Sequence, residues 1–146
     1  MRLSTRARYG LRAAVDLAEA YGGRPVSMAS IAERHEISRK YLHAILSALR
    51  AAGFVRSVRG TRGGYALARP PAAVRVRDLL EVLEGSLAPA DCVGNARACG
   101  RAKDCVTRLV WQDLHRAVEM VLSEVTLRDL VERKKRANGA DPAFGI

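Results

Sequence analysis

The chain has 146 residues, enough for one compact domain or for a small domain with an assembly element. Aromatic residues make up only 5% of it, so Leu, Val, Ile and Ala must supply the core. No run approaches the roughly 18 apolar residues of a membrane span, and arginines interrupt the apolar stretches at the start, unlike a signal peptide. We therefore expect a cytoplasmic protein with no membrane contact.

The positive charge is concentrated in the first half of the chain. The formal net charge is +10, yet residues 1–70 hold 13 Lys or Arg against 4 Asp or Glu, whereas residues 71–146 hold 12 against 11. A basic half beside a nearly neutral half is typical of a surface that binds a polyanion. Solubility alone would not require this asymmetry.

The first segment predicts a helix from Ser4 to about Tyr21. Serine is a favoured N-cap, and apolar residues recur on one face up to Ala18. Gly22 and the glycine after it can close the helix, because glycine adopts the left-handed conformation without strain.

Residues 27–53 predict two helices joined by a tight turn. Ser27 and Ser38 are N-cap candidates, and residues 35–38 form the turn. The second helix has apolar residues at three- and four-residue steps on one side and polar or basic residues on the other. Its apolar positions are Leu42, Ile45, Leu46 and Leu49. This arrangement predicts a helix-turn-helix.

A basic hairpin follows. Residues 54–58 and 65–68 predict two short strands around residues 59–64, which contain three glycines. Arg59 and Arg62 lie at the tip. Residues 1–70 are therefore predicted to form a winged helix-turn-helix.

The second half divides into four predicted segments. Residues 71–90 contain a connecting helix from about Val76 to Leu83, residues 91–105 form a cysteine loop, and residues 134–146 form a flexible tail. Residues 106–133 hold a long helix and a short one that starts at a Thr126–Asp129 capping box. The long helix has an apolar stripe of Val106, Val110, Leu114, Val118, Val121, Leu122 and Val125. The predicted fold class is mostly α with a small β-hairpin.

The three cysteines of the chain, Cys92, Cys99 and Cys105, lie within this polar loop. In the cytoplasm an odd set of thiols is more typical of metal binding or redox sensing than of a disulfide scaffold. A structural zinc site normally has four ligands and short C-x-x-C spacing, which the loop lacks. Two interpretations remain open at this point, thiols that bind a metal or a metal cluster and thiols without a ligand.

Four motifs, in order, resemble those of the Rrf-type winged-helix regulators of bacteria. They are residues 1–9, residues 37–42 entering the second helix of the helix-turn-helix, residues 58–65 in the wing, and the cysteine trio. The resemblance covers roughly residues 1–132. It implies a homodimer on a palindromic double-stranded DNA operator, with the long helix as dimerisation helix. It also implies an iron–sulfur cluster, 2Fe–2S or 4Fe–4S, on Cys92, Cys99 and Cys105.

Three regions are predicted to contact DNA. The start of the first helix offers free N–H groups and charge for phosphates, the recognition helix reaches base edges, and the wing enters the minor groove. Tyr41 has a second interpretation, in which it packs against the first helix. For the start of the first helix and for the wing, the alternative is a solvated helix end and a charged hairpin tip without a partner. The candidates are Ser4, Arg6, Arg8, Ser38, Arg39, Lys40, Tyr41, His43, Arg59 and Arg62.

The fourth cluster ligand departs from the family pattern. Relatives complete the cluster with a histidine three residues after the last cysteine or with an aspartate in the first helix; the matching residues here are Arg108 and Arg8. Asp91, Asp104, Asp113 or a small exogenous ligand remain as candidates.

The predicted function is a dimeric transcription regulator whose cluster senses cluster status, iron, nitric oxide or redox stress. The alternatives are a cluster-free repressor controlled by a thiol switch or a partner, and an iron–sulfur carrier protein. An enzyme is not expected, because no Ser/His/Asp set, phosphate-binding glycine loop or paired carboxylates are present.

Overall fold

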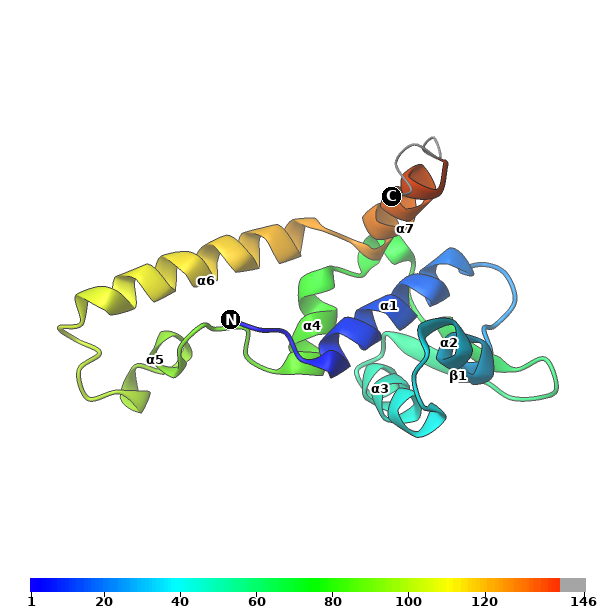
Figure 1. The fold of residues 1–146 in the computed structure, drawn as a ribbon, viewed down its shortest axis with the longest axis horizontal. Helices are drawn as coiled ribbons and strands as arrows, with labels where there is room; N and C mark the ends of the chain where they lie inside the picture. Colours follow the sequence, from blue (N-terminus) through cyan, green and yellow to red (C-terminus); the bar gives the residue numbers. More distant parts are fainter. Residues whose placement is uncertain (140–146) are drawn as a thin grey trace.

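A computed structural model describes residues 1–139 as a helical molecule with one two-stranded antiparallel hairpin, which confirms the predicted fold class (Figure 1). None of the helices among these residues is long and apolar enough to cross a membrane. The elements are α1 (Thr5–Glu19), α2 (Met28–His35), α3 (Arg39–Ala51), β1 (Val55–Val58), β2 (Gly64–Leu67), η1 (Pro71–Ala73), α4 (Val76–Glu84), α5 (Asp91–Gly94), η2 (Ala96–Ala98), α6 (Val106–Glu124) and α7 (Leu127–Gly139).

The predicted serine N-caps begin the first three helices. The hydroxyls of Ser4, Ser27 and Ser38 each accept a hydrogen bond, at 3.1 Å, from the backbone N–H three residues later. Helix α1 ends at Glu19, two residues before the predicted end, because residues 20–22 form a turn in which Gly22 adopts φ +83°. Local capping chemistry thus sets where these helices begin.

The hairpin is attached to the segment that precedes α2. Val55 pairs with Leu67 and Val58 with Gly64, so residues 59–63 form the exposed tip. Val26 exchanges two backbone hydrogen bonds with Tyr65, at 2.8 and 2.9 Å. Gly64 allows this contact, because a Cβ there would lie 2.3 Å from the Val26 carbonyl oxygen.

One apolar core joins the first half of the chain to parts of the second. Helix α3 contributes its four predicted core positions, each completely buried. Leu79, Leu80 and Leu83 of α4 and Leu127 of α7 are buried in the same cluster. Residues 71–84 and the start of α7 therefore pack as part of the winged-helix body.

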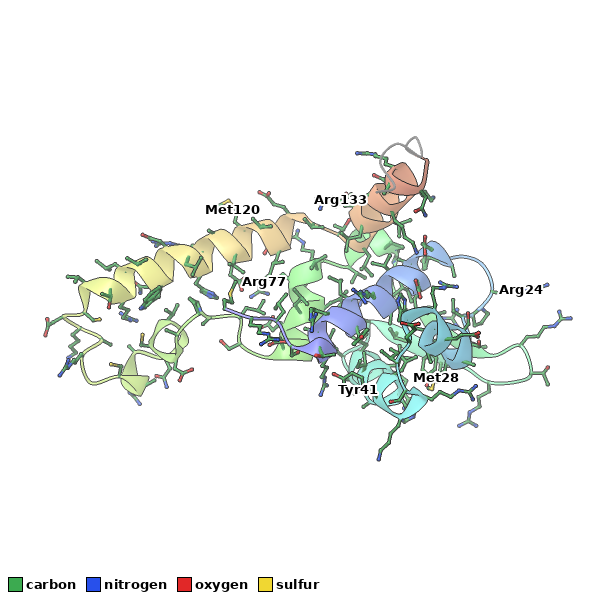
Figure 2. All side chains as sticks on the ribbon, viewed as in Figure 1. Arg24, Met28, Tyr41, Arg77, Met120 and Arg133 are labelled. Carbon is green, nitrogen blue, oxygen red and sulfur yellow. The ribbon has the colours of Figure 1, made fainter. Side chains whose placement is uncertain are left out.

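Helix α6 extends away from this body, with the cysteine loop at its far end (Figure 1). None of its 19 residues is buried. Val118 and Leu122 are half-buried, whereas Val110 and Val121 are 57% and 61% exposed. The predicted stripe therefore divides into a half-buried part near the body and a part that no other element of the same protomer covers. Figure 2 shows Met120 on the outer side of α6.

The C-terminal end of α6 is fixed to the segment that follows the wing. The N–H of Val76 donates to the Val125 carbonyl and the N–H of Leu127 to the Val74 carbonyl, both at 2.9 Å. Arg77 of α4 also donates to Glu119 of α6, and this contact raises the pKa of Arg77 above its already high ordinary value. The body and α6 are thus joined by backbone and side-chain contacts (Figure 2).

The C-terminal segment corrects the prediction of a flexible tail from residue 134. Thr126 and Asp129 form the predicted capping box, with N–H to carboxylate at 2.8 Å, and α7 then continues to Gly139. The helix persists because Lys134 donates to Glu19 of α1 at 2.7 Å, which holds α7 against α1. The rest of the predicted tail, 140–146, lies outside the described residues.

Candidate DNA interface and cysteine loop

The first turn of α3 presents polar and basic side chains. Ser38, as N-cap, and the predicted contacts Arg39, Lys40 and His43 are exposed. Tyr41 is half-buried and packs against the core, which favours the interpretation of Tyr41 as a packing residue over a base contact. The N-terminal turn of such a helix is the part that reaches base edges in the major groove.

The wing carries Arg59 and Arg62, both exposed, in the loop between β1 and β2. Gly60 adopts φ +113°, a conformation that favours glycine, and so allows the loop to turn between them. The hairpin and α3 lie at the same end of the molecule, opposite the free end of α6 (Figure 1). The geometry suits one nucleic-acid surface formed by both elements.

The start of α1 differs from the expected phosphate site. Arg6 and Arg8 are exposed as expected, but the backbone N–H of Ser4 donates to both carboxylate oxygens of Glu84, at 3.0 and 3.2 Å. The Ser4 hydroxyl also donates to Glu84. A phosphate at Ser4 would have to displace this carboxylate, a competition that the sequence did not indicate.

The cysteine loop has more regular structure than predicted. It contains the short helix α5 and the 3-10 turn η2, which begins where the Asn95 side chain accepts a hydrogen bond from the Arg97 N–H at 3.0 Å. Cys92 lies in α5 and is half-buried, Cys99 is exposed, and Cys105 is half-buried at the N-terminus of α6. All three are free thiols.

The structure does not gather the candidate ligands into a compact set. Within residues 1–139, no three His, Cys, Asp or Glu side chains lie close enough together to hold a metal ion. This also applies to the proposed fourth ligands Asp91, Asp104 and Asp113.

The surroundings of Cys105 favour the thiolate form of its side chain. The Thr107 hydroxyl, 3.1 Å from its sulfur, lowers the pKa of Cys105, and the backbone N–H of Arg108 lowers it further. Arg101 adds a smaller charge effect in the same direction. Thiolate is the form that binds metals, so this environment prepares Cys105 for ligation.

Arg108, at the position of the family's histidine ligand, forms a different contact. Its Nε donates to the Cys92 carbonyl oxygen at 3.0 Å. A guanidinium cannot coordinate iron, because it stays protonated and has no free lone pair. Arg108 therefore connects the two ends of the loop instead of supplying a ligand.

The donor chemistry of the loop fits an iron–sulfur cluster. It offers three free thiols, one of which, Cys105, has a lowered pKa, and the positively charged side chains of Arg101 and Arg108 at the end of the loop. The three thiols are not grouped in the described residues, so ligation by all three requires a rearrangement of the loop, of which Cys99 is the exposed member.

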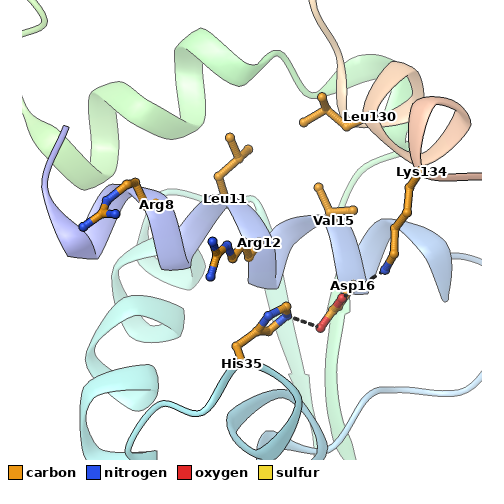
Figure 3. Close-up of a pocket in the computed structure, with 8 residues that line it drawn as sticks. All are labelled: Arg8, Leu11, Arg12, Val15, Asp16, His35, Leu130 and Lys134. Carbon is orange, nitrogen blue, oxygen red and sulfur yellow. Dashed lines mark hydrogen bonds and ion pairs between the residues drawn. The ribbon is translucent and has the colours of Figure 1, made fainter. Parts of the chain in front are cut away.

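A buried ionic cluster beside α1 was not predicted from the sequence. Asp16 is only 3% exposed, and its carboxylate accepts from His35 Nε2 at 2.7 Å and lies 3.2 Å from Arg34 and 3.8 Å from Lys134. It borders a groove of about 530 Å³ with a mainly apolar wall that includes Leu11 and Leu130 (Figure 3). Asp16 thus ties α1 to the end of α2 and to α7.

Known proteins match this chain closely. Residues 3–133 match the Rrf2 family model, described as an iron-dependent transcriptional regulator. The transcriptional regulator IscR of Cereibacter sphaeroides is 36% identical, over 99% of this chain and 96% of its own. Among solved structures, IscR of T. potens has a TM-score of 0.80 at 38% identity, covering 100% of this chain and 97% of that one. CymR, the global cysteine regulator of B. subtilis, has a TM-score of 0.77 at 38% identity, covering 91% and 98%.

Proposed function

The chain belongs to the Rrf2 family of DNA-binding transcriptional regulators, a regulator and not an enzyme, and we propose that an iron–sulfur cluster controls its binding to an operator. Cys92, Cys99 and Cys105 would hold the cluster, and two copies of the chain would bind a palindromic site. When bound, the cluster supplies iron that reacts with oxidants or nitric oxide. The fourth iron ligand is Asp91, Asp104, Asp113 or a small exogenous molecule.

The observation that carries this proposal is the placement of the cysteine loop on α6. The loop lies at the N-terminal end of α6, while the C-terminal end is hydrogen-bonded to the segment between the wing and α4. A change in the loop therefore has a continuous structural path to the DNA-binding body. The pose of α6 sets the spacing of two recognition helices, which must match half-sites one helical turn apart.

The exposed face of α6 supports the homodimer. Large apolar side chains on this helix are 40% to 76% exposed, among them Val106, Leu109, Val110, Leu114 and Val121. A helix that exposes such a stripe favours a partner, because contiguous exposed apolar patches mark sites where proteins associate. A second copy of α6 carries a matching stripe, as a two-fold symmetric interface requires.

The operator contacts that we propose are distributed over three elements. Arg39, Lys40 and His43 would reach base edges, and Arg59 and Arg62 the minor groove. Their exposure at one end of the molecule supports this assignment. At the α1 start, Arg6 and Arg8 are better placed for phosphate than Ser4, whose N–H and hydroxyl bind Glu84.

Replacing each cysteine in turn with alanine tests cluster control. Cys92→Ala, Cys99→Ala and Cys105→Ala proteins, isolated without oxygen, are expected to lose visible cluster absorption and to bind the operator with an affinity changed about 5- to 150-fold from the wild type. Iron-free wild type is the matched control and should behave like the three variants. Equal operator affinity for all proteins, loaded or iron-free, would remove the cluster from the mechanism.

A cluster-free thiol switch is the second candidate. The open arrangement of the three thiols favours it, as does the similarity to CymR, described as a global cysteine regulator. In this case freshly isolated protein would be colourless and free of iron under strict exclusion of oxygen. An oxidant or a partner protein would then change its affinity for DNA. Absorption and native mass spectrometry of anaerobically purified protein separate the two functions.

A further inference from the structure

Arg108 joins two segments that are far apart along the cysteine loop. It is the third residue of α6, it is half-buried, and its Nε donates to the carbonyl of Cys92, 16 residues earlier, at 3.0 Å. Within residues 91–139, no other hydrogen bond connects α5 with α6. This hydrogen bond therefore fastens the Cys92 end of the loop to α6, in addition to the packing of α5 against that helix.

The other end of the loop lies at the start of the same helix. Cys105 is the N-cap of α6, three residues before Arg108. The side chain of Arg108 thus connects the Cys92 end of the loop to the helix that begins at Cys105. Between these two points the loop is open, and Cys99 is exposed.

We propose that Arg108 is a positioning residue of the cysteine site, which holds Cys92 at the end of α6 where Cys105 is the N-cap before any ligand binds, and that Cys99 completes the set by moving. This proposal rests on the function proposed above for what is bound, but the positioning itself is a property of the iron-free chain. Two of the three thiols are then organised in advance, and only the exposed segment between them pays an ordering cost on binding.

The guanidinium suits this role for physical reasons. It remains charged, and a charged donor forms a stronger hydrogen bond with a carbonyl than a neutral one. Methionine has a similar length and no donor, whereas lysine keeps the charge and can still reach a carbonyl as a point donor.

The first test measures thiol reactivity in reduced, iron-free, full-length protein. Each cysteine is alkylated with N-ethylmaleimide, and the rates are followed by mass spectrometry of the digested protein. Arg108→Met is expected to raise the alkylation rate of Cys92 about fivefold, the effect of losing one hydrogen bond, and to leave Cys99 unchanged. Arg108→Lys should restore most of the protection.

Arg101→Met is the matched control. It removes a charge that also faces Cys105, from an exposed residue, and should leave the Cys92 rate at the wild-type value. An unchanged Cys92 rate in Arg108→Met would overturn the proposal, and so would an equal rise in Arg101→Met.

A second readout separates this inference from the proposed function. After anaerobic incubation with ferrous iron and sulfide, Arg108→Met is expected to lose its visible absorption several times faster than wild type, with Arg108→Lys between them. If the wild type takes up no cluster and Cys92 still becomes more reactive only in Arg108→Met, the positioning role stands and the proposed function fails. If the cluster forms and Cys92 reactivity does not change, the positioning role fails and the proposed function stands.

Discussion

Replacing Val110 with glutamate is expected to convert the protein to monomers and to weaken operator binding at least about 100-fold. Val110 is 57% exposed on α6, and in a two-fold symmetric pair of helices a carboxylate there would be buried against its own copy or its apolar neighbours. Dimers gain affinity because the second half-site is bound at high effective concentration, and monomers lose this gain. Sedimentation analysis and gel shifts at fixed salt measure both effects.

The control for Val110→Glu is Arg116→Gln on the same helix. The Arg116 side chain is 73% exposed and lies off the apolar stripe, paired with Asp113. The Arg116→Gln protein should remain dimeric with near-wild-type operator affinity. A Val110→Glu protein that sediments as a dimer and binds normally would show that the exposed stripe of α6 is not the contact between subunits.

Replacing Asp16 with alanine is expected to lower the free energy of unfolding by about 2–3 kcal/mol. The Asp16 carboxylate is buried, and its removal leaves His35, whose side chain is only 15% exposed, without its acceptor. Arg34 and Lys134, with side chains 49% and 39% exposed, can turn to solvent, which keeps the loss below that of a fully buried pair. Denaturant titration at one protein concentration measures it.

Glu19→Ala provides the comparison for Asp16→Ala. Glu19 lies on the same helix and also contacts Lys134, but its side chain is 30% exposed. Partly solvated ion pairs contribute little, so we expect a loss under about 1 kcal/mol. Equal losses for the two variants would indicate that the burial of Asp16 adds nothing to the stability of the fold.

Local patterns predicted the elements well, because capping and hydrophobic spacing act over a few residues. The three serine caps, the core of α3 and the Thr126–Asp129 box lie where the sequence placed them. Contacts between distant residues could not be predicted in this way. Asp16 meets Lys134, and Ser4 meets Glu84, only after α1 has packed against α7 and α4.

The candidate site shows the same division. The cysteine spacing and the basic first half pointed to the loop and to the DNA-binding end, since both are visible as composition. The role of Arg108 was not visible, because its contact with Cys92 depends on how α5 folds back on α6. Nor did one apolar stripe reveal that Val118 and Leu122 lie toward the body while Val110 and Val121 remain exposed.

Two backbone hydrogen bonds, made by Val125 and Leu127 where α6 ends and α7 begins, fix this junction to the segment after the wing. Helix α6 is therefore anchored to the body at its C-terminal end. A helix of 19 residues is about 28 Å long, at about 1.5 Å per residue. A displacement of about 2.5 Å at the cysteine end therefore corresponds to a rotation of α6 by only about 5° about its anchored end. A rearrangement of this size among the thiols is thus geometrically equivalent to a change of a few degrees in the angle between α6 and the body.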